Sequence, residues 1–145
     1  MMLPPKDDAK AKIVEIAREI FTRFGFKKTT MEEIALASRK GKSSIYYYFN
    51  SKEEVFKAVV EHEAAEMKEE LKEQVLCIED PVDRLKAYFA FRLKKLKELS
   101  NYYAALRSEY LNHLEFVEKI RNNFDQEEIK AVKQILEDGV EKGKF

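Results

Sequence analysis

The stretch from Thr29 to Lys52 constrains this chain most, because it carries two short helix signals separated by a tight turn. Thr30 and Glu33 have the spacing of a capping box, which predicts a helix beginning near Met31. A second short helix is expected from Lys42 to Phe49. Two brief helices bury too little to form a core, but they fit the DNA major groove when polar and aromatic groups line the second one.

Glycine and proline, the residues that favour turns, are scarce, with four and three among 145 residues. The chain therefore offers few positions for hairpin turns. Apolar residues at offsets of three and four indicate helices throughout, beginning with one from about Asp8 to Phe24 that Gly25 ends. We therefore predict an all-α protein. A three-helix head with a helix-turn-helix, residues 1–52, is joined by a long helix that starts near Ser51 to a helical bundle, residues 53–145.

Further helix signals divide the second half of the chain. Asp80-Pro81 marks a helix start with proline in the first turn. Ser100-Asn101 interrupts that helix, and the next is expected to run from Tyr103 through Leu114. A short apolar segment, 116–124, should then precede a last helix that begins near Gln126.

Net charge is zero, yet the charge is unevenly distributed. Residues 1–52 hold eleven Lys and Arg against six Asp and Glu, a net charge of +5, and residues 53–145 carry −5. A basic head on an acidic body directs a phosphate-attracting surface to one side. Chance segregation of solvated charges gives the same pattern.

The second short helix is the candidate probe for DNA. If Ile45 packs inward, then Lys42, Ser43 and Tyr46 lie outward and can reach base edges, since lysine donates to guanine and a tyrosine ring touches a thymine methyl. Hydroxyl and ammonium groups nearby are placed to hold phosphates, and these residues are Thr30, Ser44, Tyr47, Tyr48 and Lys52. Alternatively the tyrosines are half-core residues with hydroxyls in water, although three consecutive ones cannot all face inward.

The runs Thr-Thr-Met-Glu-Glu-Ile-Ala and Ser-Ile-Tyr-Tyr-Tyr-Phe-Asn-Ser-Lys-Glu-Glu-Val-Phe resemble the DNA-binding domain of the tetracycline-repressor (TetR) family of bacterial transcriptional regulators, over about residues 10–60. The resemblance implies the same base-contacting and phosphate-contacting positions as above. It also implies a cytoplasmic protein, without a cofactor, that binds a palindromic double-stranded DNA operator as a homodimer. A small-molecule effector would release it.

The turn departs from the family pattern. Ser38-Arg39-Lys40-Gly41 stands where the family usually has Ala-Gly-Val-Ser, so Arg39 is expected at a positive φ and Lys40 should lay its stem over the core. We count Arg39 among the candidate base-contacting residues.

Two successive helices of the body are rich in aromatic residues, which suits a pocket for an apolar or aromatic effector. The candidate lining is Tyr88, Phe89, Phe91, Tyr102, Tyr103, Leu106 and Tyr110. Aromatic stripes at helical spacing also form plain core. His62, His113 and the lone Cys77 have no neighbouring ligand set, so no metal site is expected.

The last residues, 135–145, resemble the stretch that in relatives leads into two further helices, which commonly form the dimer interface. We expect those helices to be missing here, so that the chain is a fragment or pairs through other surfaces. A helical interaction module that has lost DNA binding is the alternative function. An enzyme is not indicated, because the sequence offers no nucleophile–base pair, phosphate-binding glycine loop or metal set. No membrane span or signal peptide is expected.

Overall fold

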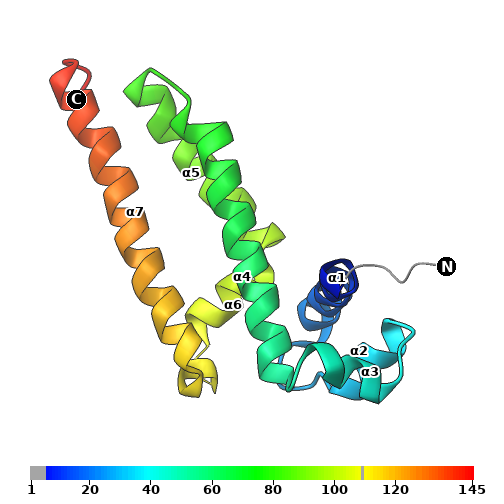
Figure 1. Cartoon of the computed structure of the whole chain (residues 1–145). Helices are drawn as coiled ribbons and strands as arrows, with labels where there is room; N and C mark the ends of the chain where they lie inside the picture. Colours follow the sequence, from blue (N-terminus) through cyan, green and yellow to red (C-terminus); the bar gives the residue numbers. More distant parts are fainter. Residues whose placement is uncertain (1–5, 109) are drawn as a thin grey trace. The chain divides into compact units, whose positions relative to one another are not determined.

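The computed structural model describes residues 6–108 and 110–145, and within them every regular element is a helix (Figure 1). The all-α prediction is therefore confirmed. In chain order the elements are α1 (Lys6–Phe24), α2 (Met31–Ala37), α3 (Lys42–Tyr48), α4 (Lys52–Leu71), the π-helical turn η1 (Lys72–Leu76), α5 (Pro81–Glu98), α6 (Ser100–Arg107), the 3-10 turn η2 (Tyr110–His113) and α7 (Glu115–Glu141).

The chain forms two compact units, residues 1–62 and 63–145, which we call the head unit and the body unit. The boundary falls within α4, so this helix contributes residues to both units. The division describes packing alone. The functions assigned to the two parts of the chain stay predictions.

The core of the head unit is built on three phenylalanine rings. The Phe21 and Phe56 rings meet edge to face at 5.1 Å between centroids, and the Phe26 ring lies 5.0 Å from that of Phe56. Gly25 has a φ of +81°, as a helix C′ position requires, and this conformation turns the chain so that Phe26 returns to the core. The prediction that Gly25 ends the first helix is confirmed.

The short helices α2 and α3 are held by caps and by a few buried side chains. Thr30 Oγ1 accepts a hydrogen bond of 3.2 Å from the Glu33 amide, which confirms the predicted N-cap. Ile34 and Ile45 are completely buried, and Phe49 is 3% exposed. Each helix thus attaches to the core through one face and leaves the other to solvent.

The body unit contains the end of α4 together with α5, α6 and α7. Asp80 caps α5 by accepting a bond of 3.1 Å from the Asp83 amide, and Pro81 occupies the first turn, as the sequence predicted. The body's largest fully buried side chains include Tyr88, Leu99 and Ile135.

The break predicted at Ser100-Asn101 falls at Leu99, so both residues belong to α6, which begins before the predicted Tyr103. Two later boundaries in the body were also predicted wrongly. The helix expected through Leu114 ends at Arg107, where Ser108 takes extended backbone, and η2 follows. The last helix begins at Glu115 instead of Gln126 and runs without a break. Both differences involve Arg121 of α7, whose guanidinium donates to the carbonyl oxygens of Ala105, Leu106 and Ser108. These bonds satisfy carbonyls at the end of α6 and join that end to α7.

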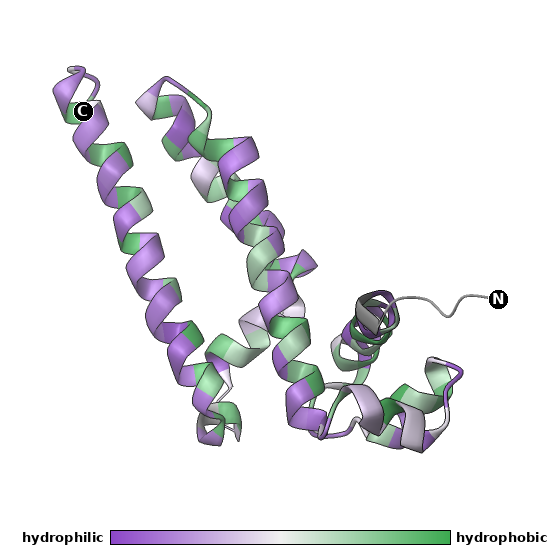
Figure 2. Cartoon of the chain, viewed as in Figure 1, coloured by the Kyte–Doolittle hydropathy of each residue, from purple (hydrophilic) through white to green (hydrophobic). Residues whose placement is uncertain are grey.

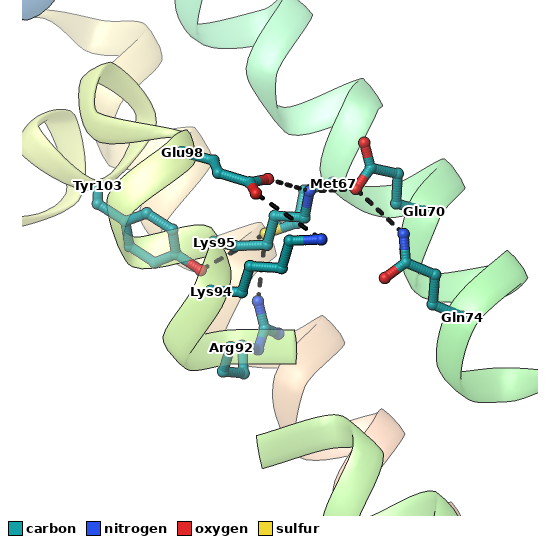
Figure 3. A network of polar contacts seen from close by, with 8 residues as sticks. All are labelled: Met67, Glu70, Gln74, Arg92, Lys94, Lys95, Glu98 and Tyr103. Carbon is teal, nitrogen blue, oxygen red and sulfur yellow. Dashed lines mark hydrogen bonds and ion pairs between the residues drawn. The ribbon is translucent and has the colours of Figure 1, made fainter. Parts of the chain in front are cut away.

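A buried ion pair network links α4 to α5 (Figure 3). Lys95 is 1% exposed, and its ammonium contacts the carboxylates of Glu70 on α4 and of Glu98 on α5, the latter at 2.6 Å. Gln74 extends the network by donating to Glu70 at 3.5 Å. A buried ammonium is tolerated only with such partners, because an unpaired charge inside a protein is very costly.

Apolar side chains also lie on the solvent side of α5 and α7. Hydrophobic residues recur between hydrophilic ones along the length of α7 (Figure 2). The exposed large ones are Phe89, Leu93 and Leu96 on α5 and Ile129, Leu136 and Val140 on α7. These helices therefore bury one apolar stripe and present part of a second.

We expect Lys95→Ala to lower the free energy of unfolding by about 1–3 kcal/mol, because it leaves two partly exposed carboxylates without their partner and removes the packed lysine stem. Lys95→Met keeps the stem and should lose less. The hydrogen bond from Lys95 lowers the pKa of Glu98, so the stability that this carboxylate adds is present above its unfolded pKa and is lost as pH falls through the folded pKa.

Urea unfolding at several pH values tests this expectation. The difference between the wild type and Lys95→Met should shrink below about pH 4, where glutamates become protonated. A difference that stayed constant into the acid range would contradict a role for the ion pairs.

Candidate functional site

The exposed face of α3 carries the side chains predicted to read DNA bases. Lys42, Ser43 and Tyr46 are all exposed, with Tyr46 at 40%, while Ile45 between them is fully buried. Three of the four predicted base-contacting residues thus share one solvent-facing helix. The fourth, Arg39, is exposed in the turn that precedes it.

Lys42 is already engaged by a carboxylate of the other short helix. Its Nζ lies 2.7 Å from Oε1 of Glu32 in the first turn of α2, and both side chains are about 60% exposed. The hydrogen bond between them raises the pKa of Lys42 and lowers the pKa of Glu32, so each group is stabilised in its charged form. The sequence reasoning gave Glu32 no role.

The turn between α2 and α3 adopts the strained conformation expected from its sequence. Arg39 has a φ of +56°, a region where an amino acid with a Cβ is strained and glycine is not. Lys40 is half-buried, and its ammonium lies 5.7 Å from the centroid of the Tyr48 ring. The turn adds two cations beside α3.

The predicted phosphate-contacting residues flank this face. Thr30, Ser44 and Tyr47 are exposed, and Tyr47 presents 67% of its surface. Tyr48 is half-buried, and its ring meets that of Tyr47 edge to face at 5.1 Å. The three consecutive tyrosines are therefore not all core residues.

Lys52, the fifth predicted phosphate contact, is held by backbone. Its Nζ donates to the carbonyl oxygens of Phe26 at 2.8 Å and Lys27 at 3.4 Å, and it lies 4.3 Å from the centroid of the Phe26 ring. These bonds tie the start of α4 to the loop after α1. An ammonium has three donors, so a third can still face a phosphate.

The structure gathers some of the predicted effector-pocket residues and separates others. Tyr102 and Tyr103 are buried, and their rings lie 6.1 and 6.2 Å from that of Phe124, while Phe89 and Tyr110 are more than half exposed. Tyr88 and Phe91 are buried on α5, and Leu106 is half-buried on α6.

Arg92 connects Tyr88 to this aromatic group. Its Nε donates to the Tyr88 hydroxyl at 3.0 Å, and its guanidinium lies 4.9 Å from the centroid of the Phe124 ring. The Tyr88 hydroxyl donates in turn to Glu128 on α7. Burial raises the pKa of both Tyr88 and Tyr102, so these hydroxyls stay protonated and can donate.

A small cleft of about 160 Å³ opens beside these rings, between α4, α6 and α7 of the body unit. Its walls include two alanines and two aromatic rings, and the Lys68–Glu127 ion pair, 3.6 Å long, lies among the lining residues. The lining is Ala64, Ala65, Met67, Lys68, Tyr102, Ile120, Asn123, Phe124 and Glu127. Only Tyr102 was predicted. Phe124 was missed because the region before Gln126 was not read as one helix.

Other kinds of site have no support in the described part of the chain. Within it, no three His, Cys, Asp or Glu side chains are grouped so that they could hold a metal ion. No described helix is both long and apolar enough to cross a membrane. Cys77 is exposed, and its thiol donates to the Glu73 carbonyl oxygen at 2.9 Å.

Comparison with known proteins identifies a family model and several regulators that are similar to this chain. Residues 13–59 match the family model of bacterial regulatory proteins, tetR family. The chain is 30% identical over 135 residues to the HTH-type transcriptional regulator QacR of Staphylococcus aureus, covering 90% of this chain and 70% of that protein. It is 28% identical over 141 residues to the HTH-type transcriptional repressor NicS of Pseudomonas putida, covering 96% of this chain and 66% of NicS.

Coverage of other relatives is smaller. The chain spans 35% and 27% of the Bacillus subtilis HTH-type regulators YhgD and YfiR, at 41% and 39% identity. Among solved structures, a TetR/AcrR-family regulator from Thermobifida fusca superposes with a TM-score of 0.77 at 23% identity, over 95% of this chain and 73% of that one. The fatty acid degradation regulator FadR from Bacillus halodurans gives 0.71 at 21%, over 100% and 73%. These structures share the all-α fold.

Replacing Arg39 by glycine should stabilise the head unit. The change removes the strain of a positive φ, partly offset by the greater freedom of glycine in the unfolded chain, so we expect a gain of about 0.5–1 kcal/mol. Lys40→Gly is the matched control: it removes a cation from the same turn at a residue without positive φ, and it should destabilise. Urea unfolding without DNA measures both. A loss of stability in Arg39→Gly would show that the backbone is not strained there.

Proposed function

Because the chain belongs to the tetR family of bacterial regulatory proteins, whose members are DNA-binding regulators and not enzymes, we propose that it represses transcription by binding an operator through α3. A small-molecule effector that binds the body unit would end repression. The similar protein NicS is named a repressor, which favours repression over activation.

One observation carries the DNA-binding proposal: Lys42, Ser43 and Tyr46 are exposed on a short helix that is anchored by the fully buried Ile45. A helix presented this way can enter the major groove, where donors and apolar groups distinguish base pairs. The flanking hydroxyls of Thr30, Ser44 and Tyr47 would meet phosphates and set the orientation. The net charge of +5 on residues 1–52 supplies the attraction that all duplexes share.

We further propose that two copies bind one palindromic operator, with half-sites about 34–36 Å apart along the duplex. The outward apolar side chains of α7 offer a surface for the second copy. Ile129, Leu136 and Val140 are 66%, 43% and 64% exposed and follow one another at seven and four residues, so they line one side of the helix.

The proposed effector site is the cleft beside Tyr102 and Phe124. A volume of about 160 Å³ is close to that of cavities that hold a benzene-sized molecule, so the occupant should be compact. Two aromatic walls favour a planar apolar ligand, and Asn123 offers one polar contact. Such a ligand weakens operator binding only if it prefers the conformation that does not bind DNA.

We expect Tyr47→Ala to weaken binding to every duplex by a similar factor and to leave the ranking of sequences unchanged. Lys42→Ala should instead change the ranking, because a good base contact discriminates by about 1–3 kcal/mol. Fluorescence anisotropy with duplexes selected from a random library measures both effects, and titration at high concentration gives the number of chains per duplex.

The same assay tests the alternative function. Affinity for random duplex should fall steeply with salt if phosphates are contacted. Wild-type protein that showed no salt-dependent binding would instead be a helical interaction module. A ranking of duplexes that Lys42→Ala left intact would remove Lys42 from the base-reading set.

Ala64→Leu should fill the cleft and abolish binding of indole, a compact aromatic probe. Leucine adds three carbons to a space that holds only a small ring, so we expect at least a tenfold loss, about 1.4 kcal/mol. Chemical-shift titration measures binding, and Ala90→Leu on the exposed side of α5 is the control. Indole that bound both variants equally would place the effector elsewhere.

A further inference from the structure

The contact between Glu32 and Lys42 joins the two helices of the candidate DNA interface on their solvent side. Glu32 Oε1 lies 2.7 Å from Lys42 Nζ, and the side chains are 60% and 59% exposed. Neither group is held by burial, so water or a ligand can replace either partner. The pair therefore forms and breaks at little cost.

Glu32 and DNA compete for the same ammonium. Lys42 can donate to O6 and N7 of guanine, which are uncharged acceptors in the major groove, or to a phosphate. A carboxylate beside that groove is repelled by phosphates and can accept a hydrogen bond only from an amino group such as N4 of cytosine. Guanine presents two adjacent acceptors in the major groove, whereas adenine presents only N7 and thymine only O4, so guanine is the base that best replaces Glu32.

We propose that Glu32 is a specificity-determining residue, which holds Lys42 on the protein until a guanine at the right position displaces the carboxylate. The inference rests on the proposed function, since it assumes that α3 enters the groove. It makes Glu32 an internal competitor: its charge lowers affinity for all duplexes, and the ion pair lowers affinity further for those that use Lys42, because only these have to break it.

The ion pair limits affinity most where Lys42 contacts a base. Glu32→Gln removes the charge, so affinity for random duplex should rise. Affinity for a selected operator should rise more, because only that complex has to break the ion pair. The ratio of specific to random binding should therefore rise, by roughly 1.5–5-fold for an exposed pair.

A matched variant separates this effect from general electrostatics. Glu33→Gln removes the same charge from the neighbouring exposed position of α2, whose partner in the described contacts is not Lys42. Removing any anion near DNA raises affinity for all duplexes alike. Only the excess of Glu32→Gln over Glu33→Gln reports the ion pair.

The decisive experiment is a double-mutant cycle by fluorescence anisotropy, with a selected operator and a random duplex at two salt concentrations. The four proteins are the wild type, Glu32→Gln, Lys42→Met and the double variant, each compared with its Glu33→Gln counterpart. We expect the excess effect of Glu32→Gln to disappear when residue 42 is methionine. Circular dichroism and thermal unfolding verify that each variant is folded.

Two results would overturn the inference while leaving the proposed function in place. One is an excess effect that persists in Lys42→Met, which would make Glu32 a general repulsive charge. The other is an unchanged ratio of specific to random binding in Glu32→Gln. Failure of the wild type to bind any duplex at low salt would instead refute the proposed function, and the inference with it.

Discussion

Helices of seven residues are not stable alone in water, so the candidate DNA interface depends on the few apolar side chains that α2 and α3 bury. Ile34 and Ile45 are fully buried, and Phe49 is nearly so, while the phenylalanine rings of α1, its following loop and α4 complete the core. Each buried residue fixes the direction of its exposed neighbours. The orientation of Lys42, Ser43 and Tyr46 is therefore a result of core packing.

The body unit is held in a different way, because charged groups occupy its interior. Lys95 is buried between Glu70 and Glu98, and Arg92 lies among Tyr88, Phe124 and Glu128. An apolar core tolerates many arrangements of similar shape, whereas a buried ion pair needs partners at defined positions. Rearranging α4 against α5 would break the contact between Lys95 and Glu70, so the network opposes such a rearrangement.

Local signals were sufficient to predict most helix ends. Gly25, Thr30 and Asp80 act through backbone conformation or through hydrogen bonds within four residues, so the local sequence was enough to predict their effects. The end of α6 could not, because its last carbonyls are satisfied by Arg121, which lies 13 to 16 residues further along the chain. Likewise, the exposed face of α3 followed from helical periodicity and the family motif, which together named Lys42 and Tyr46.

Contacts between different helices could not be predicted from the sequence. Nothing in the spacing of Glu32 and Lys42 indicates that the turn brings them within 2.7 Å, and nothing in the motif places Lys52 on the carbonyls of Phe26 and Lys27. The cleft was also missed, because its small walls come from Ala64 and Ala65, and alanine gives no signal of a binding site in a helical sequence.

The turn shows how charge and strain are combined at the interface. Arg39 at a φ of +56° costs stability that glycine would not, and the gain is an exposed cation beside α3. Lys42 and Lys52 already contact protein acceptors, so engaging DNA requires them to exchange or share partners, whereas attraction at a distance requires only net charge. Under the proposed function, the head separates two tasks: its overall basic charge favours encounter with any duplex, and the partner exchange at Lys42 makes close binding depend on sequence.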